Sequence, residues 1–349
     1  MNESRSTNDK TAEKIFDIKK RYGKSLVILT HHYQRPEVVR IGDVRGDSLG
    51  LSRYAASSGT EFIVFCGVRF MAESASILAS PGQKIFHPDP FSGCPMSDMA
   101  ELEDVEKVLG ELDEYFGPEA CLPVTYVNSS ADVKAVTGKR GGICCTSSNA
   151  AAIMEKMLST GKRILFIPDE FLGRNTAKKL GLKSEDVILW DFTEPLGGNT
   201  EKQLKDSRII LWKGYCHVHT YFRPEHVLAA WKKFPDASII VHPECNPDVV
   251  SLVDESGSTE FMVKYVEKAT IGSTIIIGTE LNLVNRLAGE NPGKKIFGLA
   301  RSMCPNMFKI TLQKVLSTME NLETGAHVTV SDEVRKYGSL ALRRMLETA

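Results

Sequence analysis

The sequence lacks any apolar run of roughly 18 residues, the length that a transmembrane helix requires. Its first residues, MNESRSTNDKTAEK, lack an apolar segment, so no secretory signal is expected. It also lacks net charge: 43 Lys and Arg against 44 Asp and Glu give −1, which offers no electrostatic support for binding nucleic acid or a membrane surface. With 42% hydrophobic and 25% charged residues, the 349-residue chain is predicted to be soluble, globular and cytoplasmic.

Cysteine is scarce, and its spacing argues against two common roles. Eight cysteines are too few for a disulfide scaffold, and the absence of a CxxC pair argues against a local structural zinc site. Cysteines inside or next to apolar runs are expected to be buried, namely Cys66, Cys121 and Cys144. Three others occur in loop-like segments with Gly or Pro nearby: Cys94, Cys216 and Cys304. If these three thiolates converge in space, they suit an iron–sulfur cluster, zinc or copper(I).

Short β-branched apolar runs alternate with helical patterns three times along the chain, which is typical of parallel sheets in α/β proteins. We expect three related α/β domains over residues 1–110, 111–195 and 196–349. The apolar run at 209–212 is expected to open the third of these layers, which also contains a predicted helix at 259–268. The first begins with a frayed extension, 1–12, and a helix at 13–21. The joins are expected at the Gly- and Pro-containing segments 110–118 and 194–200, and two further helices, 309–321 and 331–346, end the chain.

Polar residues follow the apolar runs in the strings HHYQ, YVNSS, CTSSN, HPECN and GTE. In open parallel sheets, ligands bind beyond the carboxyl ends of the strands. One polar strand end is ordinary in any α/β protein. Several ends that together carry His, Tyr, Asn, Ser, Glu and Cys favour a shared binding or catalytic site.

Eleven strings, in order, carry a family resemblance: HHYQRPEV, GDSLGLSR, FCGVRFMAE, GCPM, YVNSS, CTSSNA, YCHVH, HPEC, GST, GTE and MCPNM. Together they resemble the quinolinate synthase family, and the match runs over about residues 25–315. The resemblance implies condensation of iminoaspartate (iminosuccinate) with dihydroxyacetone phosphate to quinolinate, phosphate and water, a step of de novo NAD biosynthesis. It also implies three pseudo-symmetric parallel-sheet α/β domains around a central active site.

The resemblance further implies a cofactor and a partner. The cofactor is a [4Fe–4S] cluster held by Cys94, Cys216 and Cys304, with one iron open as a Lewis acid. Because iminoaspartate is unstable in water, a functional link to an L-aspartate oxidase that supplies it is expected. Neither nucleic acid nor a membrane is expected as a partner.

Carried over motif by motif, the resemblance also names the site residues. The implied catalytic set is Tyr33, Glu244, His31, His219 and His242. The implied substrate-binding set is His31, Ser48, Tyr126, Asn128, Ser147, His242, Glu244, Ser258 and Thr259. Hydroxyls, imidazoles and an amide suit substrates that carry carboxylates and a phosphate. Glu244 is the candidate general acid or base, and Tyr33 is expected to assist proton transfer.

Two other interpretations stay open. A different cluster-dependent hydro-lyase would use the same three thiolates on another hydroxy acid, and a requirement for both substrates separates it from a quinolinate synthase. A non-catalytic cluster-based sensor would carry a DNA-binding module or a basic patch, of which the net charge gives no sign. Cys245, next to Glu244, is expected to be a packed thiol, because a fourth thiolate would close the iron that the reaction needs.

Overall fold

Short apolar runs form three parallel sheets, as the alternation of strands and helices predicts. The structure, a computed structural model, describes residues 2–348. The chain divides into two compact units, the first made of residues 1–94 and 303–331 and the second of residues 95–302 and 332–349. Within residues 2–348, no helix has the length and apolar character needed to cross a membrane.

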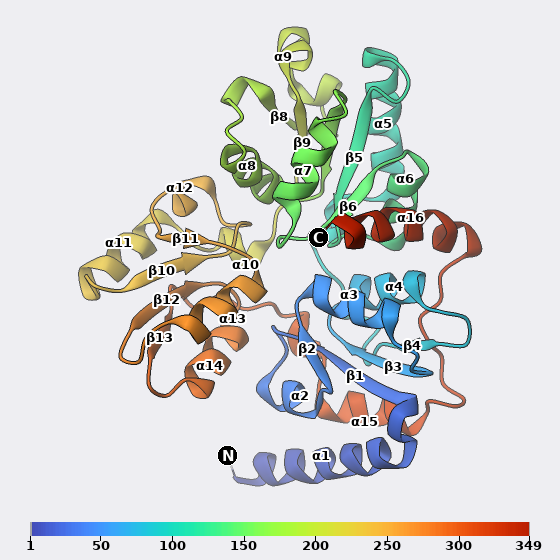
Figure 1. Cartoon of the computed structure of the whole chain (residues 1–349), viewed down its shortest axis with the longest axis vertical. Helices are drawn as coiled ribbons and strands as arrows, with labels where there is room; N and C mark the ends of the chain where they lie inside the picture. The colour runs from blue at the N-terminus through green and yellow to red at the C-terminus, as the bar shows by residue number, and fades with distance from the viewer. Residues whose placement is uncertain (1, 349) are drawn as a thin grey trace. The chain divides into compact units, whose positions relative to one another are not determined.

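The first unit contains one four-stranded sheet. Its strands, in spatial order, are β2 (Val44–Gly46), β1 (Leu26–His31), β3 (Phe62–Cys66) and β4 (Lys84–Phe86). Its helices are α1 (Asn2–Tyr22), α2 (Pro36–Ile41), α3 (Ser48–Ser57), α4 (Arg69–Leu78) and α15 (Leu312–Glu320), with 3₁₀ turns at Gly23–Ser25 and Met307–Lys309. Figure 1 shows this unit in blue, with α15 in red-orange.

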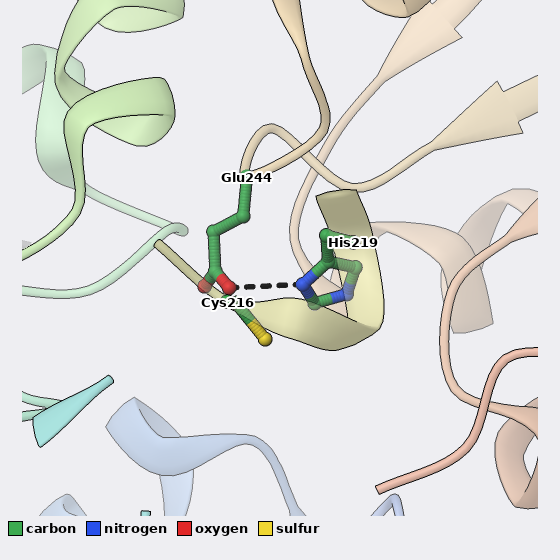
Figure 2. Close-up of side chains that lie close together, drawn as sticks. All are labelled: Cys216, His219 and Glu244. Carbon is green, nitrogen blue, oxygen red and sulfur yellow. Dashed lines mark hydrogen bonds and ion pairs between the residues drawn. The ribbon is translucent and has the colours of Figure 1, made fainter. Parts of the chain in front are cut away.

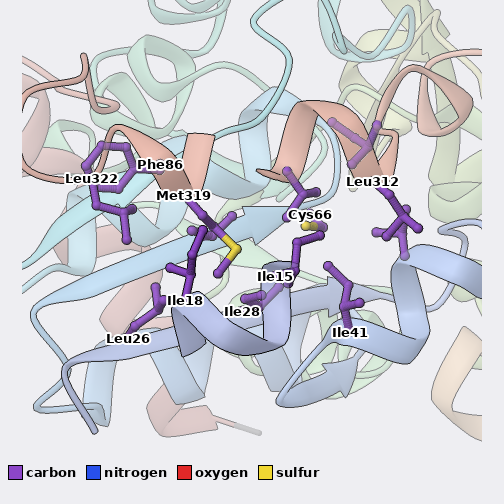
Figure 3. Packing of buried hydrophobic residues seen from close by; sticks show 14 of the residues in the cluster. Ile15, Ile18, Leu26, Ile28, Ile41, Cys66, Phe86, Leu312, Met319 and Leu322 are labelled. Carbon is purple, nitrogen blue, oxygen red and sulfur yellow. The ribbon is translucent and has the colours of Figure 1, made fainter. Parts of the chain in front are cut away.

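Helices α1 and α15 pack together on one face of this sheet, although they lie at opposite ends of the chain. The sheet supplies alternate residues of β1 and β3 to the shared core, as the two-residue period of a strand requires. Figure 3 shows this core, which includes Ile15 and Ile18 of α1 and Met319 of α15. The expectation of a frayed segment at 1–12 is therefore corrected over residues 2–12, while residue 1 lies outside the described residues: α1 begins at Asn2, and Thr11 and Ala12 are buried.

The second unit contains two sheets, of which the first has five strands. In spatial order they are β6 (Ile143–Cys145), β5 (Cys121–Tyr126), β7 (Arg163–Ile167), β9 (Ile209–Trp212) and β8 (Val187–Trp190). The accompanying helices are α5 (Leu102–Phe116), α6 (Ala131–Lys139), α7 (Ala150–Leu158), α8 (Glu170–Lys179), α9 (Glu201–Asp206) and α16 (Asp332–Thr348), with 3₁₀ turns at Ser97–Met99, Ser184–Asp186 and Pro195–Gly198.

The C-terminal helix α16 lies along α6 (Figure 1). The two backbones approach so closely that a Cβ on Gly138 would lie 1.9 Å from the carbonyl oxygen of Tyr337. Only glycine fits this position. The close contact ties the last described helix to the edge of the five-stranded sheet that carries β6.

The other sheet of this unit has four strands, in the order β11 (Glu255–Ser256), β10 (Ser238–Val241), β12 (Thr274–Gly278) and β13 (Lys295–Gly298). Its helices are α10 (His217–Thr220), α11 (Pro224–Lys233), α12 (Pro247–Val250), α13 (Thr259–Lys268) and α14 (Leu281–Glu290). The three sheets bear out the predicted α/β class with three similar parallel-sheet layers.

The predicted joins do not coincide with the limits of the sheets. Residue 110 lies inside α5, whose residues Val105, Val108, Leu109 and Leu112 pack into the core at helical spacing. The other join, 194–200, separates β8 from β9, yet these strands pair with each other. The run at 209–212 was expected to open the third layer, and instead it pairs with β7 and β8 in the second. The division into three domains itself stays a prediction.

Candidate active site

A buried carboxylate, Glu244, is the centre of the predicted residues in the second unit. Glu244 follows β10 in the turn before α12, Tyr126 is the last residue of β5, and His219 lies in α10. All three side chains are at most 5% exposed. The carboxyl ends of strands from two sheets therefore bring side chains that are distant in sequence into contact, as the polar strand ends predict.

Each oxygen of Glu244 has its own hydrogen-bond partner. The Tyr126 hydroxyl donates to Oε1 at 2.5 Å, and His219 Nδ1 lies 2.9 Å from Oε2. Figure 2 shows the His219 imidazole facing the carboxylate. The other ring nitrogen of His219, Nε2, lies 3.2 Å from the hydroxyl oxygen of Thr279. This hydroxyl accepts a hydrogen bond from a protonated His219 or donates one to the neutral ring, so it accommodates both states.

His242 packs beside this group. Its ring stacks on that of His219, with centroids 4.2 Å apart, and its Nδ1 accepts a hydrogen bond from the backbone N–H of Glu244 at 3.3 Å. Burial, assisted by the neighbouring His219 and opposed by Glu244, lowers the pKa of His242 to about 3. The ring is therefore neutral near pH 7. Because Nδ1 accepts, its proton is on Nε2.

Two buried carboxyl groups have pKa values shifted in opposite directions. Burial alone favours the protonated form of Glu244, but His242, His219 and the hydrogen bonds from His219 and Tyr126 outweigh it and hold its pKa below the usual value. Burial, and next the charge of Glu244, raise the pKa of Asp169 well above its usual value. The two environments thus push the pKa values of the two carboxyl groups apart.

Asp169 was not predicted as a site residue. Its Oδ1 accepts the N–H of Leu172 at 2.6 Å and caps α8, and the backbone N–H of Cys216 also acts on this carboxyl group and lowers its pKa, against the effect of burial. Thr279 was also missed, although it belongs to the string GTE that marks a polar strand end. That string was the one signal in the sequence that could have pointed to it.

The eight cysteines differ in burial, and the difference follows the prediction. Cys94, Cys216 and Cys304 are half-buried, whereas the remaining five are buried. Burial raises the pKa of Cys121 and of Cys144 to about 12 and raises that of Cys245 as well, so these thiols stay protonated.

Cys216 alone among the three half-buried cysteines belongs to the second unit. Its Sγ, one His219 nitrogen and one Glu244 oxygen all lie within 4.8 Å of one another (Figure 2). Cys94 and Cys304 belong to the first unit. A soft thiol donor thus lies beside the ionised carboxylate.

Other predicted residues of the second unit lie around a separate cavity of about 600 Å³ or next to it. Ser147, which follows β6, and Ser258, which caps α13, both line this cavity, together with Asn175 of α8 and Pro243. Thr259, the first residue of α13, is buried. Tyr126, His219, His242 and Glu244 do not line this cavity.

Asn128, two residues beyond β5, is half-buried, and its Oδ1 is buried without a hydrogen-bond partner among residues 2–348.

The predicted residues of the first unit occupy the equivalent edge of its own sheet. His31 ends β1, and its Nδ1 accepts the backbone N–H of Tyr33 at 3.2 Å. The two rings meet edge to face at 4.9 Å, and both side chains are buried. Ser48 is the first residue of α3.

Comparison with known proteins agrees with this picture over nearly the whole chain. A family model described as "Quinolinate synthetase A protein" matches residues 13–347. The chain is 43% identical over 345 residues to the quinolinate synthase of Herpetosiphon aurantiacus, which covers 97% of this chain and 92% of that protein. It is 45% identical over 344 residues to that of Halalkalibacterium halodurans, covering 97% and 93%. The chain therefore belongs to the quinolinate synthetase A protein family.

Proposed function

We propose that this protein is a quinolinate synthase of de novo NAD biosynthesis, which condenses iminoaspartate with dihydroxyacetone phosphate to give quinolinate, phosphate and water. Membership of the family supports the activity, and the buried Glu244 with its hydrogen-bond partners is the observation that carries it. The reaction requires several proton transfers to and from carbon and oxygen. A buried ionised carboxylate connected to a histidine and two hydroxyls suits such transfers.

In this proposal Glu244 is the general base. Tyr126 and His219 hold its two oxygens in place, so the carboxylate meets the substrate in one orientation. Because His219 donates its Nδ1–H to Oε2, a proton that Glu244 takes from the substrate stays on the carboxyl group until Glu244 returns it to a substrate atom, and the Thr279 hydroxyl holds the second nitrogen of His219. His242 stays neutral and presents Nε2–H as a hydrogen-bond donor to a carboxylate or phosphate oxygen.

The cofactor in this proposal is a [4Fe–4S] cluster held by Cys94, Cys216 and Cys304. The burial pattern fits this assignment, because the three are half-buried while burial keeps thiols such as Cys121 and Cys144 protonated. Iron–sulfur clusters take thiolate ligands. When bound, the cluster supplies an open iron that polarises a substrate oxygen or nitrogen. Cluster ligation needs reduced thiols, which suits a cytoplasmic protein, and iminoaspartate would come from an L-aspartate oxidase.

Iron content tests the cofactor, and product formation tests the activity. The wild-type protein is purified without oxygen next to Cys94→Ala, Cys216→Ala, Cys304→Ala and, as the matched control, Cys245→Ala. We expect about four irons per chain in the wild type and in the control, and loss of iron in the other three variants. Quinolinate should form only when both substrates are present. Zinc in place of iron would refute the cofactor, and product from another hydroxy acid alone would refute the activity.

A further inference from the structure

Asn175 of α8 joins the five-stranded sheet of its unit to the turn that carries Glu244. Its side-chain amide nitrogen donates one hydrogen bond to the carbonyl oxygen of Pro243 and another to that of Cys245, both at 2.8 Å. These two carbonyls belong to the residues on either side of Glu244. A single amide group therefore holds the backbone on both sides of the carboxylate.

This arrangement carries a local cost. Asn175 Oδ1 is buried and has no hydrogen-bond partner among residues 2–348. A buried acceptor that loses its water costs about 1–3 kcal/mol when it is left unpaired. Rotating the amide by half a turn would not help, since its oxygen would then face two carbonyl oxygens. Local rules of this kind are broken most often where function requires it.

Helix α8 is a firm support for this amide. Gly173 lies so close to the five-stranded sheet that a Cβ would be 2.5 Å from a Leu211 methyl group, and Asp169 caps the start of the helix. Asn175 follows Gly173 by two residues, which places it on nearly the opposite side of the helix. The helix thus contacts the five-stranded sheet through Gly173 and the Glu244 turn through Asn175.

We propose that Asn175 is a positioning residue, which fixes the turn at 242–245 so that the Glu244 carboxylate stays aligned with Tyr126 and His219. The inference rests on the proposed function for its catalytic consequence but not for its structural one. Loss of the amide releases the Pro243 and Cys245 carbonyls and lets Glu244 shift. A displacement of about 1 Å of a catalytic group costs up to about a hundredfold in rate.

The test uses Asn175→Leu, which keeps the size of the side chain, and Asn175→Asp, which puts an oxygen where the amide nitrogen donates. Asn199→Leu is the matched control. Asn199 is also half-buried and donates its side-chain amide to backbone carbonyls, those of Leu189 at 2.8 Å and Gly197 at 2.9 Å, in a loop that carries no proposed site residue. Both asparagines therefore contribute a comparable structural interaction.

Hydrogen exchange followed by mass spectrometry gives the first readout on the protein as purified. In both Asn175 variants, the amides of Glu244 and Cys245 should exchange faster than in the wild type, while the segment 189–199 keeps its protection. Asn199→Leu should give the reverse pattern. Unchanged exchange at 242–245 in both Asn175 variants would overturn the proposal, whatever reaction the protein catalyses.

Kinetics gives the second readout, measured per cluster-loaded chain. We expect kcat to fall roughly tenfold to a hundredfold in Asn175→Leu and further in Asn175→Asp, with a smaller change in KM. Asn199→Leu should keep kcat even if it lowers the unfolding temperature. Equal losses of kcat in Asn175→Leu and Asn199→Leu would mean that Asn175 has only a structural role. A wild type that forms no quinolinate would refute the proposed function and leave the exchange result standing.

Discussion

The first and third sheets present the same strand ending with different chemistry. In the first, His31 accepts the backbone N–H of Tyr33 on Nδ1 at 3.2 Å, and in the third, His242 accepts that of Glu244 at 3.3 Å. In each case a proline follows three residues later and starts a short helix: Pro36 after Tyr33 starts α2, and Pro247 after Glu244 starts α12. The frame is thus repeated, but the second residue after the histidine changes from a tyrosine to a glutamate.

In both sheets an aspartate accepts a hydrogen bond from the backbone of the strand that precedes the histidine, β1 in the first and β10 in the third. Asp43 Oδ2 accepts the N–H of Ile28 at 2.8 Å, and Asp254 Oδ2 accepts that of Ile239 at the same distance, each over a separation of 15 residues. The first and third sheets therefore share the aspartate contact and the histidine at the strand end, but they differ in the side chain two residues after the histidine. The comparison indicates that the fold supplies a histidine of fixed tautomer at each edge and that the chemistry depends on its neighbour.

The largest effect on activity is expected from substituting Glu244, the residue that follows His242 by two positions. Glu244→Gln keeps the shape of the side chain but removes the base, so kcat should fall by about 10²–10⁴. Tyr33→Phe removes only a hydroxyl and should cost less. Quinolinate formation per cluster-loaded chain measures both. If Tyr33→Phe lost more activity than Glu244→Gln, the main proton transfer would belong to Tyr33 of the first sheet and not to Glu244 of the third.

A smaller effect is expected from the buried imidazole. The pKa of His242 is about 3 in the folded protein, and its ordinary value is 6.5. Between these values the unfolded chain binds a proton that the folded protein excludes, so stability falls as the pH drops from 6.5 towards 3. The loss amounts to at most about 1.4 kcal/mol per pH unit. In His242→Asn, whose amide oxygen can still accept the Glu244 N–H, this dependence should be weaker.

Urea unfolding at several pH values inside that window measures the slope. His226→Asn is the matched control, because His226 Nδ1 also accepts a backbone N–H, from Arg223 at 3.2 Å, in a half-buried position outside the site. The control should follow the wild-type slope, and any acid loss of the cofactor is common to all three proteins. An identical slope in His242→Asn would show that His242 is not excluded from protonation in the folded state.

Local patterns predicted the elements better than the way in which they assemble. The helix expected at 259–268 is α13 with the same limits, because Ser258 caps it and its apolar residues recur at helical spacing. The run at 209–212 was recognised as a strand but assigned to the wrong layer. Its pairing with β7 and β8 depends on contacts between distant segments, which neither propensity nor periodicity encodes.

The same limit applies to the site. Glu244 and His242 belong to a polar strand end, where ligands of parallel sheets bind, but their catalytic roles were implied by the resemblance to the family. Asp169 and Asn175 were not predictable, because their roles depend on what α8 packs against. Asp169 has the residue type of an ordinary helix cap, and Asn175 that of an exposed helix position. Only the packing of α8 against the turn at 242–245 gives them another role.

The smallest effect concerns the two aspartates that hold the strands. Asp43→Ala and Asp254→Ala should each lower the free energy of unfolding by about 1–3 kcal/mol, since a part-buried N–H loses its acceptor. Asp43→Asn and Asp254→Asn keep a hydrogen-bond acceptor but remove the charge, so they show whether the charge matters equally in the first and third sheets. Asp43 also pairs with Lys19 at 2.7 Å, so Asp43→Asn should cost up to about 1 kcal/mol, whereas Asp254→Asn should cost almost nothing. Urea unfolding midpoints measure all four. If Asp254→Asn lowered the free energy of unfolding as much as Asp254→Ala, the carboxylate charge rather than the hydrogen bond would stabilise the third sheet. The aspartates of the first and third sheets would then act through different interactions.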